Sequence, residues 1–161
     1  MAIAFTGPSN SGKTTLVEKL SRMLMQERKV AIIKNDPKDK AQFDVEGKDS
    51  HKFSQTGAEV VITSSTRTTY FSQREKTLDD IVAMIHDFDI LLVEGLKTLP
   101  LPRIAVFRDS IDESYFAYSE AIATDDSINL SDYNIPKNIT LLDLNNMEQI
   151  IAWIDKHAKN L

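Results

Sequence analysis

Short apolar runs alternate with helical patterns along the chain, and this alternation is the main signal for its fold. The segments AIAFT (2–6), VAIIK (30–34) and DILLVEG (89–95) are apolar runs of strand length. Between the first two, apolar residues recur at spacings of three and four from Lys13 to about Glu27, which is the period of an amphipathic helix. Two strands joined by one helix form a βαβ unit, whose crossover is right-handed.

The rest of the chain continues this alternation. Strands alternating with helices predict an α/β fold with an open, mostly parallel sheet and helices on its faces. The further elements are a helix over 78–88, strands over 103–108, 121–124 and 139–144, a weaker strand candidate over 114–118, and a last helix for which Asn145 is the candidate N-cap.

A β-rich segment interrupts the alternation. The runs 59–65 and 67–73 are rich in β-branched and aromatic residues and almost touch, so they predict either a tight hairpin or one bent strand. Together, the stretches 59–73 and 102–118 hold more strand than a single small sheet accommodates. We therefore expect one domain over 1–161 with a β-hairpin excursion, whose exposed edges are covered by pairing in a homodimer.

Composition excludes several classes. The chain has 161 residues, 42% of them hydrophobic and 27% charged, which is typical of one soluble globular domain. The net charge of −5 lacks the basic excess of a nucleic-acid binder. No run approaches the ~20 apolar residues of a membrane span. The absence of Cys excludes disulfides and thiol catalysis, and fits a cytoplasmic location.

The strongest motif is GPSNSGKT (7–14), a full match to G-x-x-x-x-G-K-[ST] between a predicted strand and a predicted helix. Glycines let the backbone N–H groups converge on phosphate oxygens, the Lys reaches the β/γ-phosphates and the Thr hydroxyl binds Mg²⁺. This predicts a P-loop NTPase-like fold. The predicted nucleotide-binding residues are Gly7, Ser9, Asn10, Ser11, Gly12, Lys13, Thr14 and Thr15.

A second candidate lies at the end of the run 89–95. Glu94 leaves the carboxyl end of a buried strand, where open α/β sheets bind ligands, and can complete a Mg²⁺ shell. Gly95 leaves room for a phosphate beside it. We predict Lys13 and Glu94 as the catalytic residues. The alternative for Glu94 is that it is only a surface residue at the end of a strand. Lys97 is either a phosphate contact or a solvated side chain.

Several segments resemble the MobB family of molybdopterin-guanine dinucleotide biosynthesis proteins. They are GPSNSGKTTL (7–16), FDVEGKDSHKFSQTGAEVVITSS (43–65), DILLVEGLK (89–97), IAVFRD (104–109) and AIATDD (121–126). The resemblance implies a dimeric protein that binds GTP, hydrolyses it weakly and assists a MobA-type molybdenum cofactor guanylyltransferase, with molybdopterin as a further ligand. It also implies that Asp44 and Glu94 face Mg²⁺ with Thr14, and that Lys48 and Asp49 line the mouth of the nucleotide site.

Two features depart from familiar patterns. The family usually has Lys followed by histidines after the second strand, whereas here Lys34 is followed by NDPKDK without any His. The guanine-reading [NT]-K-x-D of ordinary GTPases is also missing. Our candidate for reading the base is Asp125, because a carboxylate can accept the N1–H and N2–H₂ donors of guanine. The alternative is that Asp125 only forms a turn or caps a helix.

Three functions remain open at this level. The first is a GTP-binding accessory protein with slow hydrolysis, since no arginine finger or water-orienting Gln is identifiable in the motifs. The second is a P-loop small-molecule kinase that uses the charged loop after residue 34 for its acceptor. The third is an adaptor that nucleotide only stabilises. Phosphate transfer to an added acceptor would select the kinase, and nucleotide-independent partner binding would select the adaptor.

Overall fold

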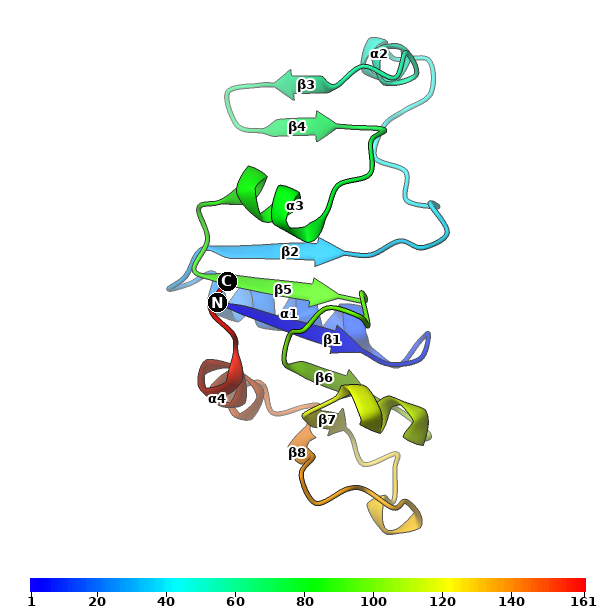
Figure 1. Cartoon of the computed structure of the whole chain (residues 1–161), viewed down its shortest axis with the longest axis vertical. Helices are drawn as coiled ribbons and strands as arrows, with labels where there is room; N and C mark the ends of the chain where they lie inside the picture. Colours follow the sequence, from blue (N-terminus) through cyan, green and yellow to red (C-terminus); the bar gives the residue numbers. More distant parts are fainter. The chain divides into compact units, whose positions relative to one another are not determined.

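A six-stranded parallel sheet forms the centre of the first of two compact units (Figure 1). The computed structural model describes all 161 residues; the first unit comprises Met1–Asn35 and Asp87–Leu161, and the second comprises Asp36–His86. The expected mostly parallel α/β sheet is confirmed. In spatial order the strands are β2 (Val30–Lys34), β5 (Ile90–Glu94), β1 (Ala2–Thr6), β6 (Arg103–Val106), β7 (Ala121–Thr124) and β8 (Thr140–Asp143).

Alternation along the central strands divides the core of this unit into two layers. In β6 and β7, Ile104 and Ala121 belong to one hydrophobic cluster, whereas Ala105 and Ile122 belong to the other. Successive strand residues point to opposite faces, so both faces must be covered and the strands are apolar throughout. The first cluster includes the buried sides of α1 (Lys13–Leu24) and α4 (Met147–His157). The second includes Phe107, Ile111, Ile128 and Ile139, which lie on the loops after the strands.

Two local expectations were wrong. Residues 114–118 form no strand but part of the 3₁₀ helix η1 (Glu113–Tyr118), at whose start the Asp112 carboxylate accepts a hydrogen bond from the Ser114 amide at 3.0 Å. Tyr115 of this helix packs edge-on against Phe107, with ring centroids 5.7 Å apart. The N-cap of α4 is Asn146 and not Asn145, because the Asn146 side chain accepts from the Gln149 amide at 3.0 Å.

The stretch 102–118 is likewise unavailable for pairing between subunits. β6 is flanked on both sides by parallel neighbours, β1 and β7, and its residues are buried. The sheet therefore uses this strand internally, and the part of the dimer argument that rested on 102–118 is wrong. A short 3₁₀ turn, η2 (Leu130–Asp132), follows β7.

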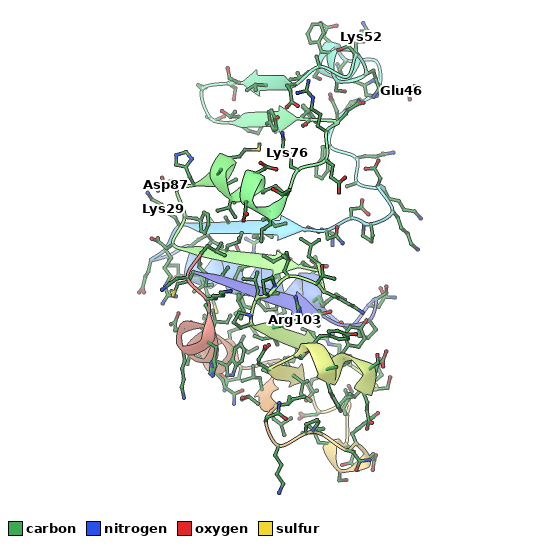
Figure 2. All side chains as sticks on the ribbon, viewed as in Figure 1. Lys29, Glu46, Lys52, Lys76, Asp87 and Arg103 are labelled. Carbon is green, nitrogen blue, oxygen red and sulfur yellow. The ribbon has the colours of Figure 1, made fainter.

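Charged residues join the amino ends of β2 and β5 (Figure 2). Lys29 Nζ lies 2.6 Å from Asp87 Oδ1, and the Lys29 amide donates to Asp89 Oδ2 at 2.7 Å. The hydrogen bond to Asp87 raises the pKa of Lys29. These contacts align the two strands, so their carboxyl ends also lie in register.

The second unit contains an antiparallel hairpin and two short helices. β3 (Val60–Thr63) pairs with β4 (Thr68–Phe71), which confirms the tight hairpin over the single bent strand. α2 (Asp49–Ser54) precedes the hairpin and α3 (Leu78–Ile85) follows it. Thr77 and Asp80 form a capping box at the start of α3. No helix in either unit has the length and apolar character needed to cross a membrane.

Candidate functional site

The loop between β1 and α1 has a backbone that its glycines make possible. Gly7 has φ +134°, and a Cβ at this position would lie 2.4 Å from the carbonyl oxygen of Val106. Gly12 has φ +92° and is the N-cap of α1, which begins without a capping side chain or an acidic residue in its first turn. The first amides of α1 are therefore left for another acceptor, as in helix N-termini that bind anions.

Lys13 folds back over this loop. Its Nζ donates to the Pro8 carbonyl oxygen at 2.5 Å and to Ser11 Oγ at 3.4 Å. Burial lowers the pKa of Lys13, against the opposing effect of the Glu94 carboxylate. The ammonium group thus lies at the concave side of the loop, close to the acid at the end of the neighbouring strand.

Glu94 ends β5 beside the P-loop strand, as the sequence predicts. Thr14 Oγ1 lies 3.3 Å from Glu94 Oε2, and Lys34 Nζ lies 2.9 Å from Glu94 Oε1. The Glu94 side chain is 12% exposed and the Lys34 side chain 57% exposed. A hydroxyl and a carboxylate of this kind are the hard oxygen donors that Mg²⁺ accepts, usually with phosphates and water completing its shell. The donor set therefore fits Mg²⁺.

Gly95 turns the chain away from the end of β5. It has φ +94°, and an added Cβ would lie 3.0 Å from Cβ of Asn35. Its amide donates to the Phe5 carbonyl oxygen at 3.0 Å. Lys97 lies over the ring of Tyr115, with Nζ 4.0 Å from the centroid, so its contact here is an aromatic ring.

Arg108 is a residue of this site that the sequence analysis missed. It lies just after β6 and lines a cavity of about 320 Å³ together with residues of the P-loop. Arg108 Nε is the atom nearest to a Cβ added at Gly12, at 3.3 Å. The available signal was an Arg directly after the apolar run at the carboxyl end of a strand. The other lining residues are Asn10, Gly12, Lys13, Thr14 and Thr15.

Asp125 follows β7 and is joined to Arg108. Arg108 Nε lies 3.1 Å from Asp125 Oδ2, while Asp125 Oδ1 accepts from Ser127 Oγ at 2.5 Å and from the Ser127 amide at 3.1 Å. The hydrogen bond from the Ser127 side chain holds the pKa of Asp125 below its ordinary value. Asp125 also lines a second cavity of about 300 Å³, whose other lining residues are Thr124, Asp126, Ile128, Leu130, Leu141, Leu142 and Asp143.

The remaining predicted residues belong to the second unit. Asp44 Oδ1 accepts from Ser50 Oγ at 3.0 Å, while Asp44 Oδ2 is buried without a hydrogen-bond partner. Lys48 is the N-cap of α2, and Asp49, the first residue of this helix, pairs with Lys52 at 3.5 Å. Their membership of the nucleotide site stays a prediction. No group of three or more His, Asp or Glu side chains comes together as a metal cluster anywhere in the chain.

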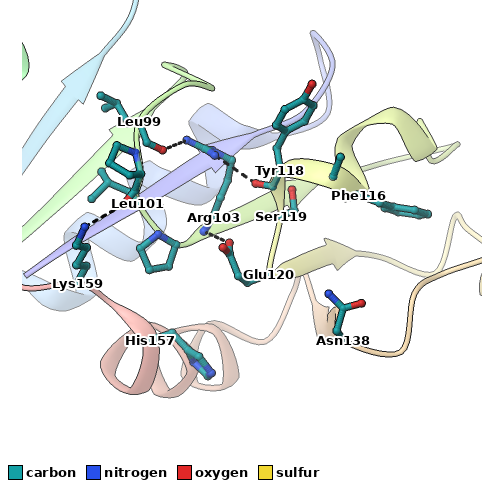
Figure 3. Close-up of a pocket in the computed structure, with 13 residues that line it drawn as sticks. Leu99, Leu101, Arg103, Phe116, Tyr118, Ser119, Glu120, Asn138, His157 and Lys159 are labelled. Atoms are coloured by element: carbon teal, nitrogen blue, oxygen red, sulfur yellow. Dashed lines mark hydrogen bonds between the residues drawn. The ribbon is translucent and has the colours of Figure 1, made fainter.

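A larger cavity of about 700 Å³ lies elsewhere, at the amino end of β6 (Figure 3). The Arg103 guanidinium beside it donates to the carbonyl oxygens of Leu96, Leu99 and Tyr118 at 3.1–3.2 Å. The Arg103 amide donates to Glu120 Oε2 at 2.7 Å. Arg103 therefore fixes the loop that follows Gly95: both of its Nη atoms donate to protein carbonyls, while its buried Nε has no hydrogen-bond partner.

Strand, glycine-rich loop, helix and an acid on the neighbouring strand together define a P-loop NTPase-like protein. The chain belongs to the MobB family, described as molybdopterin guanine dinucleotide synthesis protein B, whose sequence model matches residues 2–125. It is 32% identical over 162 residues to the molybdopterin-guanine dinucleotide biosynthesis adapter protein of Haemophilus influenzae, covering 95% of this chain and 86% of that protein. The protein of the same name from Escherichia coli is 29% identical, over 96% of this chain and 93% of its own.

Solved structures agree on the fold. MobB of Bacillus subtilis superposes with a TM-score of 0.78 at 19% identity, over 99% of each chain. The hydrogenase maturation factor HypB from Archaeoglobus fulgidus superposes with a TM-score of 0.54 at 17% identity, over 97% of this chain and 87% of its own. The likeness to HypB shows that this fold also occurs outside the MobB family.

Proposed function

We propose that this protein is a GTP-binding adapter of molybdopterin guanine dinucleotide biosynthesis, with weak Mg²⁺-dependent GTPase activity at most. The observation that carries the proposal is the Gly7–Thr14 loop beside Glu94, since its backbone is shaped for phosphate and its helix N-terminus is uncapped. The role in the pathway rests on family membership and on the names of the two relatives, both of which are called adapter proteins.

In this proposal the triphosphate lies along the loop. Amides from residues 9–15 donate to the phosphate oxygens, and Lys13 leaves its contact with the Pro8 carbonyl to reach the β/γ-phosphates. Thr14 and Glu94 hold Mg²⁺, which would neutralise charge on the same phosphates. Asp44 is the third proposed metal residue, as the resemblance to the family implies. Lys48 and Asp49 are proposed at the mouth of the site.

Hydrolysis is expected to be slow. Attack by water on the γ-phosphate needs a positioned water and stabilisation of the charge that spreads over the phosphate oxygens. Lys13 supplies part of that charge, and Glu94 is the proposed group for holding a water on the metal. Lys34, however, occupies one oxygen of Glu94. We therefore expect turnover far below the ~1–10³ s⁻¹ of ordinary enzymes.

The proposed partners are a MobA-type guanylyltransferase, molybdopterin and a second copy of the chain in a cytoplasmic complex. Support for the homodimer is confined to the hairpin, because an isolated two-stranded sheet is marginal in water and leaves its edges unpaired. Exposed apolar side chains on the same unit, among them Phe43, Phe53 and Val61, add surface that a partner would cover.

Calorimetry tests the proposal. The protein is titrated with GTP, ATP and GMP at fixed Mg²⁺, alone and with the guanylyltransferase. We expect GTP to bind more tightly than ATP, and Lys13→Ala to abolish triphosphate binding with an unchanged circular dichroism spectrum. Lys19→Ala, an exposed change on α1, is the control. Unchanged GTP affinity in Lys13→Ala would refute the assignment, and transfer of phosphate to an added acceptor would indicate a kinase instead.

A further inference from the structure

Arg108 lies between the two halves of the proposed nucleotide site. On one side it lines the P-loop cavity next to Gly12 and Thr15. On the other side its Nε is 3.1 Å from Oδ2 of Asp125, the residue proposed to read the base. The Arg108 side chain is 42% exposed, against 17% for Asp125, so the guanidinium can move more freely than the carboxylate. Arg108 thus lines the P-loop cavity and also contacts Asp125, which lines the second cavity.

The Asp125 carboxylate has little capacity left in this arrangement. A carboxylate has about four lone-pair positions, two on each oxygen. Oδ1 uses both of its positions on the amide and hydroxyl of Ser127, and Oδ2 uses one on Arg108. Guanine presents two donors side by side, N1–H and N2–H₂, and needs two acceptor positions. With Arg108 in place only one remains.

We propose that Arg108 exchanges Asp125 for the α-phosphate of the bound nucleotide, and so frees the carboxylate to accept guanine. The proposal rests on the proposed function, because it takes GTP as the ligand and Asp125 as the base-reading residue. In the absence of nucleotide Arg108 holds Asp125. When a phosphorylated nucleotide binds, the guanidinium turns to the phosphate and Oδ2 becomes available.

The α-phosphate is the partner that the geometry favours. Lys13, Thr14 and Glu94 gather on the β5 side of β1, which is the side proposed for the β- and γ-phosphates and Mg²⁺. Arg108 follows β6, on the opposite side of β1, towards β7 and Asp125. A phosphate between the loop and the base lies on this side. Guanidinium can bind phosphate through two parallel N–H···O bonds, which replace its contact with Asp125.

This exchange makes base recognition depend on phosphate. A guanine nucleoside without phosphate cannot draw Arg108 away, and has to compete with it for Asp125. A nucleotide removes Arg108 and then meets a free carboxylate. Adenine nucleotides also attract Arg108 but present no donor pair to Asp125. Arg108 therefore acts as a specificity residue that selects phosphorylated guanine ligands over free guanosine.

Ligand-observed NMR titrations of guanosine and GMP test the exchange in the full chain. Arg108→Gln removes the charge, and Arg108→Lys keeps it as the matched control. In Arg108→Gln we expect GMP to bind about tenfold more weakly, because a charge-assisted contact is lost. We expect guanosine to bind several-fold more tightly, because Asp125 no longer has a competing cation. Arg108→Lys keeps the charge but cannot form two parallel bonds, so GMP should weaken less than in Arg108→Gln and guanosine should gain less.

Other patterns overturn the proposal. If Arg108 only holds Asp125 in place, guanosine and GMP both weaken in Arg108→Gln. If Arg108 contacts the phosphate without leaving Asp125, GMP weakens and guanosine is unchanged. Failure of the proposed function is distinguishable, because wild-type protein would then bind neither GMP nor GTP. The proposed function survives if the wild type binds GTP and Lys13→Ala abolishes that binding. Either of the two contrary patterns in Arg108→Gln then refutes only the exchange.

Discussion

Lys34 and Glu94 lie opposite each other in the parallel pair of β2 and β5, and their side chains form an ion pair, with Nζ 2.9 Å from Oε1. The same carboxylate is within 3.3 Å of the Thr14 hydroxyl. Lys34 therefore occupies an oxygen that the proposed Mg²⁺ needs, and the metal must compete with an ammonium group for Glu94. Because the Lys34 ammonium is more than half exposed, breaking the Lys34–Glu94 ion pair costs only a modest free energy.

Replacing Lys34 by Met should lower the Mg²⁺ concentration at which GTP binding is half-maximal, by up to about fivefold. The expected change corresponds to the ~0.2–1 kcal/mol range of an exposed ion pair. Mg²⁺ titrations at fixed GTP measure it, and Lys19→Met on the exposed side of α1 is the control. A higher Mg²⁺ requirement in Lys34→Met would mean that Lys34 contacts the nucleotide and does not compete with the metal.

A side chain at Gly7 should damage both folding and nucleotide binding. The added Cβ would overlap the Val106 carbonyl oxygen at 2.4 Å, and φ +134° is itself strained for any other residue. Gly57 also has a positive φ, of +79°, but its Cβ would meet nothing within 4 Å. We expect Gly7→Ala to lower the free energy of unfolding by about 2–4 kcal/mol, and Gly57→Ala by about 1 kcal/mol.

Urea unfolding with and without GTP compares the two variants. Gly57→Ala should retain GTP affinity, because it changes only a turn after α2. Equal destabilisation of both variants, with GTP binding retained in Gly7→Ala, would show that the loop relaxes around the new methyl group.

The sequence predicts which elements form this site better than it predicts which of them lie side by side. The apolar runs 2–6 and 89–95 and the P-loop between strand and helix are local patterns, and the structure confirms each as an element. Which strands lie side by side is not encoded locally. Lys34 meets Glu94, and Arg108 meets Gly12, across long separations in sequence that only the strand order brings together.

The segment 114–118 shows a second reason why the sequence alone does not predict every element. Its aromatic residues have the composition of a strand, but Asp112 starts a 3₁₀ helix and Tyr115 packs on Phe107. Tertiary contacts decide between helix and strand for so short an apolar run, and its residue types alone do not.

Asp155 of α4 pairs with Arg28, the residue that connects α1 to β2. Arg28 donates from Nη1 to Asp155 Oδ1 and from Nη2 to Oδ2, the latter at 3.0 Å. These two hydrogen bonds lower the pKa of Asp155 and raise the pKa of Arg28. Because the pKa of Asp155 is depressed in the folded state, its stabilising effect is present above the ordinary Asp value. The effect is lost as the pH falls through the folded value.

At pH 7, Asp155→Asn should therefore lower the free energy of unfolding by about 0.5–1 kcal/mol, since the pair is partly exposed. The difference from wild type should shrink below pH 4 and disappear once Asp155 is protonated in the folded wild-type protein. Urea unfolding between pH 2.5 and pH 7 measures this, with Asp126→Asn as an exposed control. A constant difference across the whole range would assign the loss to packing of the side chain and not to its charge.

Asp125→Asn should change the base that the protein prefers. In the Asn variant the amide oxygen stays with the two Ser127 donors and the NH₂ group faces the base, so it accepts neither guanine donor. Xanthine has the acceptor O2 where guanine has N2–H₂, so the Asp carboxylate repels it and the Asn NH₂ group can donate to it. We expect Asp125→Asn to bind GTP about tenfold to a hundredfold more weakly, because a polar group on the base loses its partner, and to bind XTP more tightly than wild type does.

Asp126→Asn, next to it and exposed, should leave the preference for GTP unchanged. Competition between GTP and XTP for the same preparation measures the ratio directly and cancels any general loss of active protein. If Asp125→Asn keeps the wild-type ratio, Asp125 serves the Ser127 turn alone and guanine is read by another part of the chain.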